Sequence, residues 1–120
     1  MAHSGNTGLK RLVLATKYSW QGFRAAYANE EAFRQETWLA LVFIPLGFYL
    51  GETGVEKALL VCSVLLLMLV EILNSAIEAV VDRFGGEHHE LSGRAKDMGS
   101  AAVLLAMVFS TVTWGAILFL

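Results

Sequence analysis

Residues 58–82, ALLVCSVLLLMLVEILNSAIEAVVD, decide the fold of this chain. Their first half is apolar apart from Cys62 and Ser63, which predicts one long hydrophobic helix that crosses a bilayer. The polar residues of the second half fall on one narrow face of that helix, and they are Glu71, Asn74, Ser75, Glu78 and Asp82. An acidic side chain at the bilayer centre costs roughly 2.5–3.5 kcal/mol on insertion scales, so this stripe needs partners, water or a bound cation.

The depth of the stripe suggests a role for it. About 20 helical residues counted from Val55 make one bilayer span, which ends near Asn74. We therefore expect Glu71 just inside the hydrocarbon and Glu78 just outside it. A stripe at that boundary can bring a water-soluble reactant to a lipid-borne one. The alternative is that the stripe only joins helices through interhelical hydrogen bonds.

The composition is that of an integral membrane protein with one domain. Of the 120 residues, 56% are hydrophobic, and the mean hydropathy of +0.56 is too high for an ordinary soluble domain of this size. The net charge of −2 gives no sign of nucleic-acid binding. A single cysteine, Cys62, excludes an intrachain disulfide and a cysteine-based zinc site. No cleavable signal peptide is expected near Met1.

The remaining patterns predict an all-α helical bundle. Apolar residues recur at helical spacing through residues 9–27 with cations opposite them, which predicts an amphipathic helix in the membrane interface, within an N-terminal arm of residues 1–28. Residues 29–120 are expected to form a transmembrane domain with three spans, at about 31–50, 55–82 and 98–120. The first span must take its first turns from the charged stretch 29–36, and Pro45 is expected to kink it. We expect a loop over residues 85–98.

The basic residues predict the orientation. Only Lys57 lies near the first loop, and the others fall in the N-terminal arm or the second loop, namely Lys10, Arg11, Lys17, Arg24, Arg34, Arg83, Arg94 and Lys96. The positive-inside rule then places the N-terminus and the second loop in the cytoplasm and the C-terminus outside. Three spans cannot bury their own polar faces, so we expect a homo-oligomer with a site shared between subunits.

The polar residues expected at the cytoplasmic interface are those needed for phosphoryl transfer. They are Glu30, Glu71, Asn74, Glu78, Lys96 and Asp97. Paired carboxylates favour Mg²⁺, Lys96 offers a cation for a phosphate, and a partly buried Glu71 suits a general base. No Walker-type loop or protein-kinase motif is present. His88 and His89 are adjacent and point in different directions, which favours a solvated loop over a metal pair.

The segment from Glu71 to Asp82 resembles the signature E-x-[hydrophobic]-N-[ST]-[SA]-[hydrophobic]-E-x-x-V-D of the small prokaryotic diacylglycerol kinases. Similar agreement is found in YSW at 18–20, RAA at 24–26, NE at 29–30, AFRQE at 32–36 and HELSGRAKDMGSAA at 89–102. The resemblance implies a homotrimer of three-span subunits in the bacterial inner membrane, each with an N-terminal surface helix. It also implies an enzyme that transfers the γ-phosphate of MgATP to the primary hydroxyl of diacylglycerol, giving phosphatidic acid and ADP.

The resemblance also implies roles for individual residues. Glu71 corresponds to the general base and Asn74 to a residue that supports it, while Glu30 and Glu78 correspond to the metal-binding carboxylates. Nucleotide contacts are implied for Arg11, Tyr18, Glu30, Glu78, Glu87, His88, His89, Lys96 and Asp97. Lipid-site positions are implied for Arg24, Gln35, Glu36, Glu71, Ser100 and Trp114. The implied site combines residues of neighbouring subunits.

Three alternatives remain open at this point. A sister branch of the family phosphorylates undecaprenol with similar motifs. A small proton-coupled transporter would also use an intramembrane glutamate, although it would not need Glu78, Lys96 and Asp97 on the cytoplasmic side. A purely structural assembly partner would lose no function if Glu71 and Glu78 became glutamine.

Overall fold

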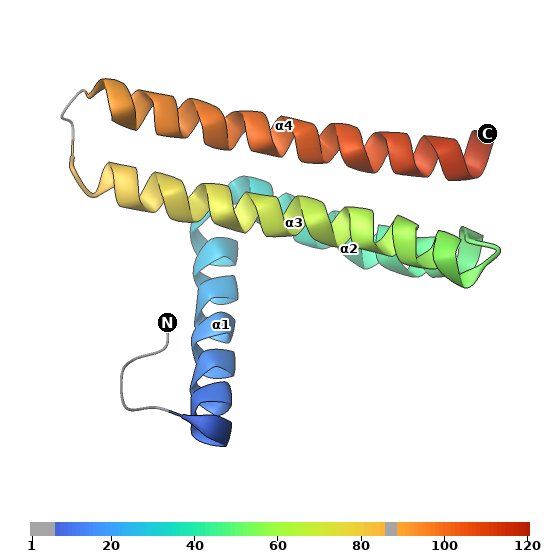
Figure 1. Cartoon of the computed structure of the whole chain (residues 1–120), viewed down its shortest axis with the longest axis horizontal. Coiled ribbons are helices and arrows are strands. Elements are labelled where there is room, and N and C mark those ends of the chain that lie inside the picture. Colours follow the sequence, from blue (N-terminus) through green and yellow to red (C-terminus); the bar gives the residue numbers. More distant parts are fainter. Residues whose placement is uncertain (1–6, 86–88) are drawn as a thin grey trace.

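The computed structural model describes residues 7–85 and 89–120, and within them all regular structure is helical. The helices are α1 (Gly8–Asn29), α2 (Glu31–Leu50), α3 (Gly54–Asp82) and α4 (Glu90–Phe119). Figure 1 shows α2, α3 and α4 running lengthwise and α1 lying crosswise to them. The predicted all-α class is therefore confirmed, and so is the presence of a helix over the amphipathic stretch of residues 9–27.

A single extended residue separates α1 from α2. Glu30 has φ −118° and ψ 109°, so the chain changes direction there without a loop. The carbonyl of Tyr27 accepts a hydrogen bond from Arg34 Nη1 (3.1 Å), and the hydroxyl of Tyr27 accepts one from Trp38 Nε1 (3.2 Å). These bonds join the last turn of α1 to the first two turns of α2 and hold the two helices at their crossing angle.

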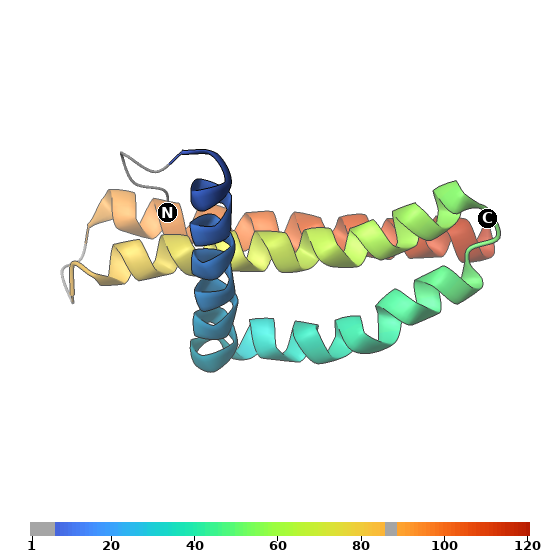
Figure 2. The same ribbon diagram turned by 90° about the horizontal axis from the view of Figure 1, so that it is seen from below.

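α2 begins inside the charged stretch, as predicted. Its first residue is Glu31, and the helix continues through Pro45 to Leu50. Figure 2 shows that the ribbon of α2 bends along its length, in agreement with the predicted kink. Two helices among the described residues are long and apolar enough to cross a membrane, namely α3 and α4, which contain 18-residue stretches with mean hydropathies of 2.3 and 2.1. The polar first turns of α2 dilute its hydropathy, so its crossing stays a prediction.

α3 is the central helix, because it packs against both α2 and α4. Its N-terminus is capped by Thr53, whose hydroxyl accepts a hydrogen bond from the Glu56 amide (3.1 Å). The pair α3 and α4 is antiparallel. Ser110 Oγ lies 3.4 Å from Ser63 Oγ, and near the other end of the pair Lys96 Nζ lies 2.7 Å from Asp82 Oδ1.

The predicted loop over residues 85–98 is wrong from Glu90 onward, because α4 begins there. His89 caps this helix, since its Nδ1 accepts a hydrogen bond from the Leu91 amide (3.0 Å). Glu90 then places a negative charge in the first turn, where the helix dipole favours it. α4 is thus a 30-residue helix whose first turns are polar, rather than an apolar span that begins at Met98.

The buried core of one chain is small. Its apolar members are Ala26, Phe33, Ala40, Leu60, Val61 and Ala106. Large apolar side chains on all four helices are instead exposed; Leu12, Leu41, Leu69 and Leu105, for example, are each more than half exposed. A surface this apolar belongs against lipid or against other protein chains.

Candidate active site

The acidic stripe of α3 runs from a buried end to an exposed end. Glu71 is only 7% exposed and is the one buried charged residue in the described part of the chain. Asn74 and Glu78 are half-buried, and Asp82 is exposed. The sequence placed Glu71 and Glu78 on opposite sides of a boundary, and their burial in the structure follows the same order.

A carboxyl group from α2 approaches the buried end of this stripe. The carboxyl groups of Glu36 and Glu71 lie close enough to interact electrostatically. The Oε1 atom of Glu36 is buried and accepts no hydrogen bond within the described residues. This pair therefore places two carboxyl groups, one of them with an unused acceptor atom, beside an apolar pocket.

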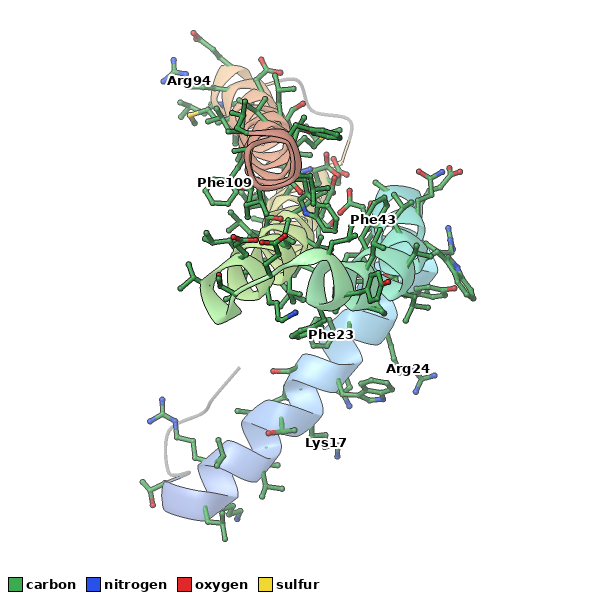
Figure 3. All side chains as sticks on the ribbon, turned by 90° about the vertical axis from the view of Figure 1, so that its right-hand side faces the viewer. Lys17, Phe23, Arg24, Phe43, Arg94 and Phe109 are labelled. Carbon is green, nitrogen blue, oxygen red and sulfur yellow. The ribbon has the colours of Figure 1, made fainter. Side chains whose placement is uncertain are left out.

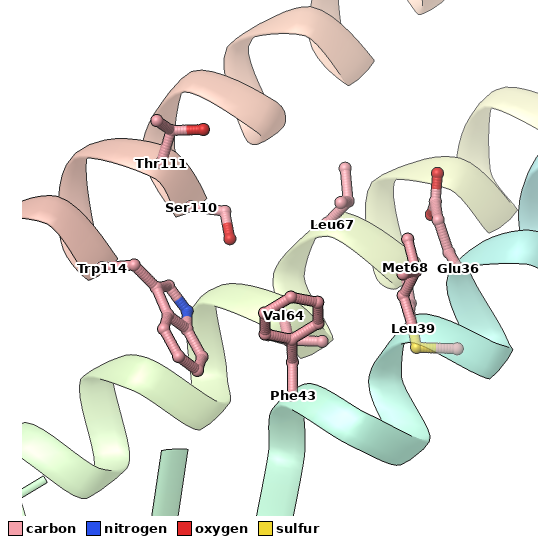
Figure 4. Close-up of a pocket in the computed structure, with 9 residues that line it drawn as sticks. All are labelled: Glu36, Leu39, Phe43, Val64, Leu67, Met68, Ser110, Thr111 and Trp114. Carbon is pink, nitrogen blue, oxygen red and sulfur yellow. The ribbon is translucent and has the colours of Figure 1, made fainter. Parts of the chain in front are cut away.

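An apolar pocket of about 270 Å³ lies between α2, α3 and α4, beside Glu36. Its lining is formed by Glu36, Leu39, Phe43, Val64, Leu67, Met68, Ser110, Thr111 and Trp114 (Figure 4). Figure 4 shows Glu36 and Trp114 at opposite sides of this space. Two of the lipid-site residues implied by the sequence resemblance thus line one cavity. The other lining residues were not singled out from the sequence, because residues on separate helices share no sequence pattern.

Trp114 is held firmly at its side of the pocket. Its indole N–H donates to Ser63 Oγ (3.0 Å) and to the Leu60 carbonyl (3.2 Å). The ring of Phe43 meets it edge to face, with centroids 5.4 Å apart and an interplanar angle of 87°. The orientation of Trp114 is therefore fixed by α2 and α3 together.

The other implied lipid residues lie elsewhere. Arg24 lines a separate hollow of about 770 Å³ between α1, the start of α2 and Met68 of α3. Figure 3 shows Phe23 pointing toward the other helices while Lys17 and Arg24 point away from them. Gln35 is exposed and donates to Glu31 Oε1 (3.4 Å), and Ser100 is exposed on α4. The structure of one chain therefore does not bring these residues to the apolar pocket.

The exposed end of the stripe carries the cation predicted for phosphate. Lys96 Nζ forms an ion pair with Asp82, and it also interacts electrostatically with Glu78. The hydrogen bond and the charge of Asp82 raise the pKa of Lys96 above its ordinary value, with a smaller contribution from Glu78. The sequence placed Lys96 beside Glu78 but did not anticipate its pairing with Asp82. The register of the α3–α4 pair is what brings these residues together.

The other predicted nucleotide residues are spread over both ends of the chain. Arg11 is exposed on α1, Tyr18 is half-buried on the same helix, and Asp97 is exposed on α4 beside Lys96. His89 is the cap of α4. Glu87 and His88 lie outside the described residues. Across residues 7–85 and 89–120 the side chains of Arg11 and Asp97 form no ion pair.

The predicted metal ligands are Glu30, between α1 and α2, and Glu78 of α3, and both are half-buried. The described part of one chain contains no group of three or more His, Cys, Asp or Glu side chains placed to hold a metal. Mg²⁺ in phosphoryl-transfer sites usually takes one or two carboxylates together with substrate phosphates. Glu30 and Glu78 are carboxylates, the ligand type that Mg²⁺ takes in such sites.

These features define a helical membrane protein in which the buried Glu71 and the half-buried Glu36 lie between an apolar pocket and a polar, charged end. The chain belongs to the prokaryotic diacylglycerol kinase family, whose model matches residues 17–118. The similarity to relatives covers nearly the whole chain. A diacylglycerol kinase of Haemophilus influenzae is 58% identical over 113 residues, which are 94% of this chain and 96% of that protein.

More distant relatives carry the same name. A diacylglycerol kinase of Escherichia coli K12 is 55% identical over 111 residues, which are 92% of this chain and 91% of that protein. One of Helicobacter pylori is 45% identical over 108 residues, which are 90% of this chain and 84% of that protein. The resemblance found in the sequence is thereby confirmed, and so is the inference that the chain is a kinase.

Proposed function

We propose that this protein transfers the γ-phosphate of MgATP to the primary hydroxyl of 1,2-diacylglycerol, giving phosphatidic acid and ADP. The observation that carries the proposal is the position of Glu71. This carboxyl group is buried beside Glu36 and near an apolar pocket, and the same helix ends in charged groups beside Lys96. A lipid alcohol and a nucleotide can thus approach one helix from opposite sides of a boundary.

The contacts of α1 support that boundary. α1 meets α3 along a shared hollow in which Ser19, Gly22 and Phe23 face residues 65–73 of α3. An amphipathic helix lies in the plane of the membrane interface. The turns of α3 beyond Leu73, which carry Glu78 and Asp82, then extend past that plane into water. On this placement Glu71 lies just inside the hydrocarbon, close to the interface.

The chemistry follows from these positions. Glu71 accepts the proton of the lipid hydroxyl as the new O–P bond forms, the bond between the γ-phosphorus and the β-phosphate oxygen breaks, and ADP leaves. Asn74 supports Glu71 from the next turn of α3. Lys96 binds the phosphates, and Glu30 and Glu78 hold Mg²⁺, which neutralises charge on the phosphates when bound. Further nucleotide contacts are assigned to Arg11, Tyr18, Glu87, His88, His89 and Asp97.

The lipid contacts are assigned to Arg24, Gln35, Glu36, Ser100 and Trp114. We place the protein in the bacterial inner membrane with three spans per subunit, a cytoplasmic N-terminus and second loop, and a C-terminus outside. The separation of Arg11, Glu30 and Lys96 in one chain favours a homotrimer in which neighbouring subunits complete each site. The matched relatives are named for diacylglycerol, which favours this lipid over undecaprenol.

The test measures ATP turnover in mixed micelles that contain either diacylglycerol or undecaprenol. We expect turnover that requires Mg²⁺ and diacylglycerol, and a loss of roughly 10²- to 10⁴-fold in Glu71→Gln, which is the usual contribution of a general base. Glu31→Gln is the matched control, because Glu31 is exposed at the start of α2. Full turnover by Glu71→Gln would remove Glu71 from the base role. Turnover with undecaprenol alone would reassign the substrate.

A further inference from the structure

Gly99 of α4 lies directly against the polar stripe of α3. It is buried, and a Cβ atom built on it would overlap the side-chain oxygen of Asn74. The two helices are antiparallel, so the contacts along them form a ladder: Trp114 with Leu60, Ser110 with Ser63, and Lys96 with Asp82. The contact between residues 99 and 74 falls within this ladder, between its apolar and its charged ends.

The atom that meets Gly99 is itself unusual. Asn74 Oδ1 is buried and accepts no hydrogen bond from the described residues. A buried amide oxygen without a donor is costly, so such atoms are rare unless a ligand or a mechanism uses them. Asn74 is one turn from Glu71 and one turn from Glu78, and Gly99 is one turn from Lys96 on the facing helix. The unpaired oxygen therefore lies at the centre of the predicted site.

We propose that Gly99 is a positioning residue for Asn74, an inference that rests on the function proposed above. The missing side chain leaves a recess in α4, and the amide of Asn74 occupies it. Glycine weakens a helix interior relative to alanine, so this recess is kept at a cost to α4. A methyl group at position 99 would force the amide to rotate away from its place beside Glu71.

The test is a double-mutant cycle with Gly99→Ala and Asn74→Ala in the full-length protein in detergent micelles. Gly99→Ala is expected to lower kcat at least tenfold while the KM for MgATP changes less than twofold. In the Asn74→Ala background, the same substitution is expected to cause no further loss of kcat. The melting temperature is expected to fall in Gly99→Ala and to recover in the double variant. Gly115→Ala is the matched control, because nothing lies within 4 Å of a Cβ at that position of α4.

The outcomes separate this inference from the proposed function. If Gly99→Ala lowers kcat by the same factor in the wild type and in Asn74→Ala, the loss is a general packing defect. That result would overturn the inference. Wild-type-like kcat and melting temperature in Gly99→Ala would also overturn it, while leaving the kinase assignment intact. If Gly99→Ala fails to fold, folding of the double variant supports the contact and misfolding of the double variant refutes it. If the wild type shows no lipid-dependent turnover, the proposed function fails. The melting temperatures of the two single variants and the double variant then still show whether residues 74 and 99 are coupled.

Discussion

Replacing Trp114 by phenylalanine removes the indole N–H that joins α4 to α3. That N–H donates to Ser63 Oγ at 3.0 Å and to the Leu60 carbonyl at 3.2 Å, and Ser63 is completely buried. Interhelical hydrogen bonds in membrane proteins are worth about 0.6 kcal/mol on average and up to about 1.7 kcal/mol. Because the indole has a single N–H that both acceptors share, its loss is expected to lower the free energy of unfolding by about 0.6–2 kcal/mol. Phenylalanine keeps an aromatic ring against Phe43, so the hydrogen bonds account for most of the loss.

The measurement is unfolding in mixed micelles with increasing amounts of a denaturing detergent, followed by circular dichroism. Trp20→Phe is the control, because Trp20 is 64% exposed and its indole makes no hydrogen bond in the described part of the chain. Ser63→Ala combined with Trp114→Phe completes a cycle in which a coupling of about 0.5–1.5 kcal/mol is expected. The reasoning is refuted if Trp114→Phe is as stable as Trp20→Phe.

Three further substitutions test other contacts. A Cβ at Gly51 would lie 2.7 Å from the backbone nitrogen of Lys57, so Gly51→Ala is expected to destabilise the α2–α3 turn by about 1–3 kcal/mol in the same unfolding assay. The ammonium of Lys57 donates hydrogen bonds to the carbonyls of Phe48 and Gly51, both at 2.6 Å. Lys57→Met is therefore expected to lower the melting temperature. An unchanged melting temperature would show that water replaces these hydrogen bonds. Asp82→Asn is expected to lower the pKa of Lys96 toward its ordinary value in an NMR titration. Because the folded pKa of Lys96 is raised, the stabilisation from this pair is present below the ordinary lysine pKa and is lost as the pH rises through the raised value.

The helices themselves followed from local sequence patterns. The helix predicted over about 55–82 agrees closely with α3 (Gly54–Asp82), because an unbroken apolar run with a polar stripe has only one regular solution in a bilayer. The bend in α2 followed from Pro45, since proline removes a backbone donor wherever it occurs in a helix. The start of α4 did not follow, because its first turns are polar and hydropathy alone reads them as a loop. The cap at His89 was the local signal that could have corrected this.

The candidate site, too, could be predicted only in part from the sequence. The residues of the stripe could be grouped from α3 alone, because helical spacing fixes which of its side chains share a face. The approach of Glu36 to Glu71, the pairing of Lys96 with Asp82 and the contact of Gly99 with Asn74 each join two helices. Such contacts depend on the register and rotation of packed helices, which no single segment encodes. Two of the three involve a residue that the family resemblance had already assigned to a substrate.

The exposure of one chain bears on how its site is completed. Glu71 is shielded by helices of its own chain, whereas Lys96, Asp97 and Arg11 are exposed. In the proposed reaction Glu71 must be kept from bulk water, and this chain supplies that shield by itself. Phosphate-binding groups must converge on one anion, and in one chain Arg11 on α1 and Lys96 at the start of α4 have no contact with each other. This division is the reason for proposing an assembly in which each subunit contributes its own buried Glu71 and shares its cations with a neighbour.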